Sequence, residues 1–271
     1  MKKITKYIPT IILTLLCSCS DYLDIVPDNV TTLDIVFNNR NTAERYLANC
    51  YHFVPDHGSV KRIPGMGAGH ECWFYTTNDS HFDNEVSFYI ARGLQNIDAP
   101  YANYWDGEGG SNLPMFRAIR ECNIFLDYVR DQHKVNDLTD SERKRWIAEV
   151  NVLKAYYHFF LFEHYGPIPI VDKALPVSTD PEGVKVTRMP VDQIVDYMVK
   201  LIDDSYKDLP PVITMEATEM GRLTQPAALA LKPKYCCGQL VLSSMETKIM
   251  QISEMKKENH SSTKNSAVKN G

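Results

Sequence analysis

The sequence lacks the excess of positive charge that nucleic-acid-binding domains carry. Its 29 lysines and arginines are outnumbered by 34 aspartates and glutamates, which gives a formal net charge of -5 at pH 7. A protein that binds a phosphate backbone needs a basic patch or stripe to neutralise it. We therefore expect no nucleic-acid partner.

Sequence motifs that identify common catalytic sites are also missing. His70-Glu71 lacks the second histidine of a His-Glu-x-x-His zinc helix, and Gly107-Glu-Gly-Gly110 lacks the Lys-Ser/Thr that completes a phosphate-binding loop. No Gly-x-Ser-x-Gly stretch marks a nucleophilic serine, and no spacing singles out a carboxylate pair for glycoside hydrolysis. We therefore predict that the protein is not an enzyme and needs no cofactor.

Few cysteines are available for disulfide bonds. Of the seven, two lie in the first nineteen residues and two lie in the last forty. The other three have no repeating spacing, and their odd number excludes a disulfide-rich scaffold. Cys50 and Cys122 fall on apolar faces of predicted helices, which favours buried free thiols. A single bridge between Cys50 and Cys72 stays open as the alternative.

The N-terminus has the three parts of an export signal. Lysines at positions 2, 3 and 6 make a basic start, residues 8–16 form an apolar run, and Leu16-Cys-Ser-Cys19 precedes a polar Ser-Asp. The apolar run is too short for a transmembrane helix, which needs about 20 residues. Leu, two small residues and Cys resemble the bacterial lipobox, in which the cysteine is lipidated and becomes the mature N-terminus. We predict a signal peptide over residues 1–18, lipid attachment at Cys19 and a body tethered to a membrane; an ordinary cleaved signal is the alternative.

Helical periodicity dominates the body of the chain. Apolar residues recur at helical spacing over residues 41–54, 113–130 and 140–165, then from Pro190 to the Pro210-Pro211 pair, and again over 227–231. Thr139-Asp-Ser-Glu142 has the sequence of a capping box, and Gly166-Pro167 ends the long helix that follows it. No segment alternates like a strand for long, so we predict a mainly α fold built from helix pairs.

An irregular region separates the first predicted helix from the second. Residues 56–110 mix Gly, Asp, Asn and aromatic residues without a helical period. A loop region of that length is uncommon in a compact domain and is often functional. Within it, Asp79 to Glu85 is dense in oxygen ligands that could hold calcium, but it lacks the EF-hand spacing, which favours a solvated loop.

Several stretches together resemble one family. Their order and spacing are similar to those of the SusD/RagB family of outer-membrane nutrient-binding lipoproteins of Bacteroidetes. The resemblance covers residues 1–232, roughly the N-terminal half of a usual member. The stretches are Cys19-Ser-Asp-Tyr-Leu-Asp24, Arg120-Glu-Cys-Asn-Ile-Phe-Leu-Asp127, residues 148–160, Tyr165-Gly-Pro-Ile-Pro-Ile170 and Gly221-Arg-Leu-Thr-Gln-Pro-Ala-Ala-Leu-Ala-Leu-Lys232.

The resemblance implies a tetratricopeptide-like helical-repeat scaffold with long irregular loops, incomplete here. It implies a lipid-anchored protein on the outer membrane that faces the cell exterior and captures oligosaccharides or other nutrients. Its partner would be a SusC-like TonB-dependent transporter, over which the lipoprotein sits as a lid. The alternative function is a helical-repeat envelope lipoprotein that acts only as a protein–protein scaffold; a lipoprotein glycosidase is disfavoured because no catalytic constellation occurs.

The predicted ligand site lies in the irregular region. Sugars stack their apolar C–H faces on aromatic rings, while Asp, Asn and Arg side chains bind hydroxyls, and loops of such composition often form sites. The alternative is that Trp73 and Trp105 pack on the helices beneath. The predicted ligand-binding residues are Trp73, Tyr75, Asp79, Arg92, Tyr104 and Trp105.

The segment from Pro233 onward departs from the family pattern. A proline at this position is expected to end the helix that begins at Ala227. Codons that encode Lys232-Pro-Lys-Tyr-Cys-Cys237 can be read in another frame as Ala-Lys-Val-Leu-Leu. That second peptide fits the family pattern at this position. We therefore predict a helical domain over residues 19–232 and a disordered, out-of-frame tail over 233–271; a genuine but divergent C-terminus is the alternative.

Overall fold

The secondary structure of the described part of the chain is helical. A computed structural model describes residues 33–58, 68–69, 86–98, 100–107, 113–175, 182–183 and 185–241. One unit ends at Val36, and its described part is the short helix α2, Leu33–Val36. The other unit runs from Phe37 onward. Every regular element among these residues is a helix, which confirms the predicted mainly α fold.

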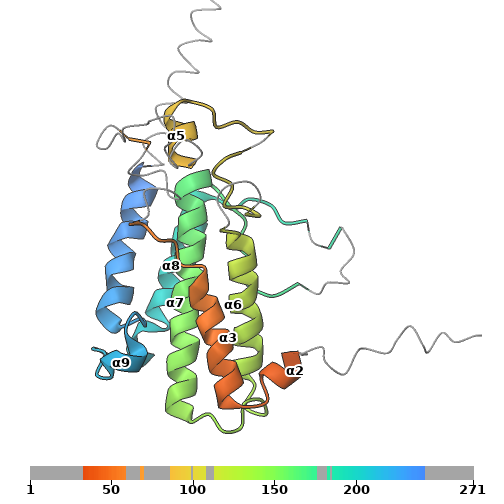
Figure 1. Ribbon diagram of the computed structural model, residues 1–271, viewed down its shortest axis with the longest axis vertical. Helices are drawn as coiled ribbons and strands as arrows, with labels where there is room; N and C mark the ends of the chain where they lie inside the picture. Colours follow the sequence, from red (N-terminus) through yellow and green to blue (C-terminus); the bar gives the residue numbers. More distant parts are fainter. Residues whose placement is uncertain are drawn as a thin grey trace, which may run out of the picture. The chain divides into compact units, whose positions relative to one another are not determined.

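The centre of the larger unit is the long helix α7, Asp140–Tyr165 (Figure 1). It packs against α6 (Met115–Arg130), α8 (Val191–Asp203) and α3 (Arg40–His52). Sixteen of its 26 residues are buried, so it is covered on all sides and not along one stripe only. This explains its composition, because a helix that is surrounded by neighbours needs apolar residues on every face.

Hydrogen bonds from side chains fix the helix starts. Thr139 and Glu142 form the predicted capping box of α7, in which the Thr139 hydroxyl accepts from the Glu142 N–H at 3.3 Å. The Glu142 carboxylate accepts in return from the Thr139 N–H. For α3 the side chain of Asn39 accepts from the N–H of Thr42 at 3.1 Å, so the helix begins slightly before the predicted range 41–54. Each such bond satisfies a backbone donor that has no partner within the helix.

Arg143 closes the C-terminal end of α6. Its guanidinium is buried and donates to the backbone carbonyls of Val129 at 2.6 Å and Val135 at 2.9 Å. Two further bonds reach the carbonyls of Asp131 and Lys134. One side chain on α7 thereby satisfies four carbonyls in and after the last turn of α6, and it ties the two helices together.

Three short elements connect the longer helices. Helix α5, Val86–Ala91, lies inside the region predicted to be irregular. The 3-10 turn η1, Tyr206–Asp208, follows α8, and the single-turn helix α9, Glu216–Glu219, precedes the final helix. The rest of the described part of residues 56–110 has no helix or strand, as the sequence predicted.

The last helix corrects the predicted helix end at Pro233. Residues 225–241 are helical and continue through Pro233, so the expected break at that proline is wrong. Tyr235 is fully buried and its ring stacks on Phe159 of α7, with ring centroids 4.6 Å apart. Gly238 also approaches Phe159 so closely that a Cβ there would lie 3.2 Å from its ring. These contacts offset the backbone hydrogen bond that the helix loses because Pro233 has no N–H. The expectation that the helix ends at this proline considered only that loss.

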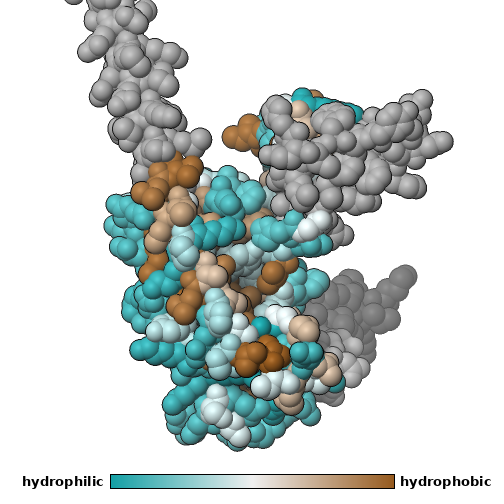
Figure 2. Space-filling model, turned by 90° about the vertical axis from the view of Figure 1, so that its left-hand side faces the viewer, coloured by the Kyte–Doolittle hydropathy of each residue, from teal (hydrophilic) through white to brown (hydrophobic). Residues whose placement is uncertain are grey.

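Helix 225–241 also carries exposed apolar side chains. Leu229, Leu240 and Val241 are 41%, 71% and 58% exposed. Figure 2 views the molecule from the side of this helix and shows apolar residues among hydrophilic ones. Within the part of the chain described here, no helix is long and apolar enough to cross a membrane.

The cysteines follow the favoured prediction where they can be assessed. Cys50 on α3 and Cys122 on α6 are free and buried. The pKa of the Cys50 thiol is raised by its hydrogen bond with Cys122 and by burial. Cys72, the partner in the alternative bridge, lies outside the described residues.

Candidate functional site

Only part of the predicted ligand site falls on described residues. Trp73, Tyr75 and Asp79 lie outside them, as do the oxygen-rich segment 79–85 and the predicted lipid-attachment residue Cys19. In the described ranges no group of three or more His, Cys, Asp or Glu residues could hold a metal ion. The remaining predicted residues are Arg92, Tyr104 and Trp105.

Tyr104 belongs to the core. It is fully buried, and its ring makes edge contacts with Phe160, at 4.9 Å between centroids, and with His164. Burial raises the pKa of Tyr104 to about 12. A side chain in this position cannot stack on a sugar from solvent, so we leave Tyr104 out of the candidate site, contrary to the expectation from the sequence.

Trp105 is half-buried and stays a candidate. Its ring packs edge-on against Phe116 of α6 and Tyr165 of α7, at 4.6 and 5.5 Å between centroids. The guanidinium of Arg188 lies 5.4 Å from the ring centroid, and it donates to the carbonyls of Pro167 and Tyr165 at the end of α7. Trp105 therefore anchors its loop to two helices, and the residue as a whole is only partly buried.

Arg92 lies directly after α5 and is exposed. Its guanidinium is 6.0 Å from the ring centroid of Phe88, and no hydrogen bond or cation–π contact joins it to Trp105 within the described residues. The same segment holds a surface pair that the sequence argument missed. Tyr89 and Tyr101 stack with centroids 4.1 Å apart. Their spacing in the sequence gives no sign of this pairing, because it depends on the loop between them.

A polar cleft of about 500 Å³ lies between the end of α3 and the start of α6, and Asp106, the residue after Trp105, is part of its lining. We call it the polar cleft. Its size is in the range of small-molecule binding sites. None of its residues was predicted from the sequence, since helix positions and a loop tip form it together. The lining residues are Asn49, His52, Phe53, Asp106, Gly107, Pro114 and Arg117.

The loop wall of the polar cleft is fixed by backbone contacts. Gly107 has a φ of +82°, and a Cβ at this position would lie 2.8 Å from Pro114, so only glycine fits. Asn103 donates to the carboxylate of Asp106 at 2.5 Å and accepts from the N–H of Trp105 at 3.1 Å. These contacts hold the Asp106 carboxylate in place without a ligand.

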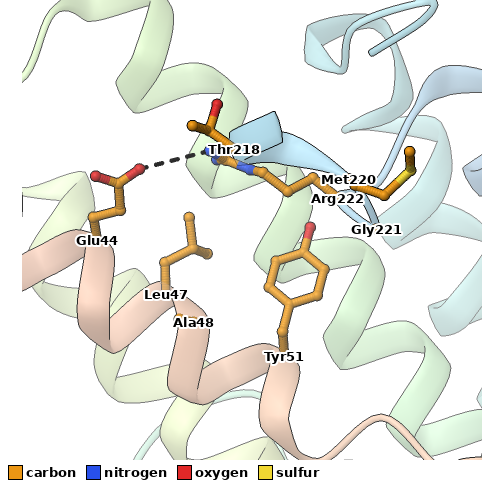
Figure 3. Close-up of a pocket in the computed structure, with 8 residues that line it drawn as sticks. All are labelled: Glu44, Leu47, Ala48, Tyr51, Thr218, Met220, Gly221 and Arg222. Carbon is orange, nitrogen blue, oxygen red and sulfur yellow. Dashed lines mark ion pairs between the residues drawn. The ribbon is translucent and has the colours of Figure 1, made fainter. Parts of the chain in front are cut away.

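A second hollow lies between α3 and the segment that follows α9 (Figure 3). It measures about 350 Å³. Leu47, Ala48 and Tyr51 line it from α3, and Figure 3 shows the ion pair between Glu44 and Arg222 across it, at 3.8 Å. Its remaining lining residues are Thr218, Met220 and Gly221.

A buried carboxylate next to this hollow has a structural role. The side chain of Glu149 on α7 is fully buried and pairs with Arg145 at 2.9 Å and with Arg222 at 3.0 Å. The hydroxyl of Tyr51 donates to the same carboxylate at 2.9 Å and accepts from the N–H of Leu223. Because charge and hydrogen bonds are matched, Glu149 fastens the segment after α9 to α3 and α7 and is not free for acid–base work.

The fold and these loops describe an all-helical scaffold with a polar cleft and aromatic residues at one end of its helices. A family model named SusD-like_3 and described as "Starch-binding associating with outer membrane" matches residues 21–235. The chain therefore belongs to the SusD-like family, as the sequence motifs indicated. The description also associates the family with the outer membrane.

Solved structures share the scaffold at low sequence identity. A laminarin binding SusD-like protein matches with a TM-score of 0.57 and 18% identity. A SusD-like protein from Bacteroides fragilis NCTC 9343 gives 0.56 and 18%. Surface glycan-binding protein A from Bacteroides thetaiotaomicron, solved in complex with laminarihexaose, gives 0.53 and 18%. At these identities the likeness shows the fold alone.

The chain spans less than half of these structures. The matches cover 73%, 78% and 73% of this chain, but only 40%, 36% and 38% of the three proteins. No curated protein matches the chain.

Proposed function

We propose that the protein is a non-catalytic, cell-surface lipoprotein that binds oligosaccharides and passes them to a SusC-like TonB-dependent transporter. The lipid would be attached at Cys19 and would hold the protein on the outer membrane. Membership of a family described as starch-binding supports the ligand class. The names of two structural relatives, which mention laminarin and laminarihexaose, agree with it.

The observation that carries the proposal is the half-buried Trp105 in a loop whose next residue, Asp106, lines the polar cleft. An aromatic face next to carboxylate, amide and guanidinium groups suits sugars, which present both C–H faces and hydroxyls. Trp105 is held by Phe116 and Tyr165, so little freedom is lost when a ligand binds. Trp73, Tyr75, Asp79 and Arg92 stay in the proposal as further ligand contacts predicted from the sequence.

The experiment is a glycan-binding screen run beside a hydrolysis assay on the same samples. We expect binding of one glycan class, measured by calorimetry, with no release of reducing ends. Hydrolysis would assign the protein to the glycosidases. Failure to bind any glycan, together with capture of an envelope protein, would favour the alternative of a protein–protein scaffold.

A further inference from the structure

We propose that the polar cleft is the place where the oligosaccharide is held, and that its ligand is a neutral glycan and not a uronic-acid or sulfated one. This rests on the proposed function and assigns it to particular residues. The cleft is formed by α3, by the loop that ends at Gly107 and by the first turn of α6.

Polar groups on the α3 side of the cleft have unused hydrogen-bonding capacity. Asn49 and His52 are both exposed, and neither side chain has a hydrogen-bond partner in the described ranges. An amide offers two donors and an acceptor, and an imidazole offers one of each. Such mixed groups suit hydroxyls, which donate and accept at the same atom.

The opposite wall adds groups of both charges. Asp106 lines the cleft from the loop, and Arg117 lines it from α6 with its side chain 70% exposed. Arg117 also lies 3.9 Å from Glu121, one turn further along the helix. A glycan carboxylate or sulfate in the cleft would therefore meet the carboxylate of Asp106 as well as the guanidinium of Arg117, which also pairs with Glu121. The cleft has no excess of positive or negative charge that would favour a charged sugar. The guanidinium can donate to a neutral hydroxyl and the carboxylate can accept from one.

The floor and the exit of the cleft suit the apolar faces of a sugar. Phe53 lies at the floor, 8% exposed, with its ring 5.7 Å from that of His52. Trp105 directly precedes Asp106 and is half-buried. Its position in the loop is one residue from the cleft lining, and Phe53 supplies the aromatic ring of the lining itself. Because Gly107 and Asn103 fix the loop, the cleft is formed before a ligand binds.

The test compares three variants by titration with two probes. Laminarihexaose is the neutral probe and an oligogalacturonate of similar length is the acidic one. Asn49→Ala and Arg117→Ala alter the cleft. Arg45→Ala on α3 is the matched control, because it removes an exposed arginine that does not line the cleft. Thermal melting of each variant checks that the fold is intact.

We expect the parent chain to bind the neutral probe and both cleft variants to bind it at least tenfold more weakly, with Arg45→Ala unchanged. Stronger binding of the acidic probe would overturn the neutral assignment. Unchanged binding by both cleft variants would overturn the cleft as the site and leave the proposed function standing. If the parent binds neither these probes nor any glycan of the wider screen, both proposals are wrong.

Discussion

Tyr235 stacks on Phe159 with an angle of 26° between the ring planes, and this contact joins the last helix to the centre of the fold. It lies two residues after the proline that the sequence argument took as the end of the helix. Tyr235 is fully buried, although its hydroxyl has no hydrogen-bond partner among the residues that the structure describes. Packing on α7 thus holds a segment whose sequence alone argues against a helix.

Tyr235→Ala should therefore destabilise the protein by about 3 kcal/mol, the usual effect of deleting a buried aromatic ring. Pro233→Ala should act in the opposite direction, because it restores an N–H donor in the helix interior. Urea denaturation followed by circular dichroism measures both. Cys236→Ala is the control, since this neighbour is exposed. Equal stability of the parent and Tyr235→Ala would show that residues 233–241 do not pack on α7.

Arg143→Ala should cost about 2–3 kcal/mol of stability, because four backbone carbonyls around the end of α6 lose a charged donor. Lys144→Ala is the matched control. It removes a positive charge from the adjacent position, where the lysine side chain is exposed. Denaturation midpoints at pH 7 report the difference. If the two variants are equally stable, water satisfies the four carbonyls equally well, and Arg143 does not stabilise the end of α6.

His158 should make stability depend on pH. It is fully buried, its Nδ1 lies 2.8 Å from the carbonyl oxygen of Lys154 and its Nε2 accepts from the N–H of Val171. Burial lowers the pKa of His158 from 6.5 to about 4. The unfolded chain therefore binds a proton at higher pH than the folded chain does. This contribution is complete above pH 6.5 and is lost as the pH falls toward 4, with a span of about 3 kcal/mol.

The comparison for this prediction is His158→Gln, which keeps a donor and an acceptor but does not titrate. We expect the parent to lose more stability than the variant between pH 7.5 and pH 4.5. His57 and His164 also have lowered pKa values because of burial, and they contribute equally to both proteins. Parallel stability curves for parent and variant would exclude His158 as the source.

Features that depend on neighbouring residues could be predicted from the sequence, and features that depend on packing between distant helices could not. Thr139 and Glu142 were correctly predicted as a capping box, because such a box depends on four consecutive residues. Pro233 and Tyr104 were misjudged, because their states depend on rings of α7 that are distant in sequence. The polar cleft was not foreseen for the same reason. Asn49, Asp106 and Arg117 become neighbours only when α3 and α6 pack.

Cys19→Ala should prevent membrane attachment. The prediction rests on Leu16-Cys-Ser-Cys19, since a lipobox without its cysteine cannot receive lipid. Expression in a Bacteroides host followed by membrane fractionation should find the parent with membranes and the variant released or unprocessed. Cys17→Ala is the control, because the adjacent cysteine is not the predicted site. Unchanged membrane association of Cys19→Ala would refute the assignment.

Trp73→Ala and Trp105→Ala should weaken glycan binding. The effect is best measured in a version of the protein that is extended to full family length. The present chain spans 36–40% of the three solved relatives described above, so we expect it to bind more weakly than that version. Calorimetric titration with the best glycan of the screen measures the loss, which we expect to be about 0.5–1.5 kcal/mol per stacking ring. Trp105 also packs on Phe116 and Tyr165, so its removal can disturb the loop itself. Trp105→Phe separates the two effects: it keeps an aromatic ring for packing and for stacking, and it should retain most of the binding. If both alanine variants melt like the parent and bind as tightly, the ligand contacts lie outside this loop region.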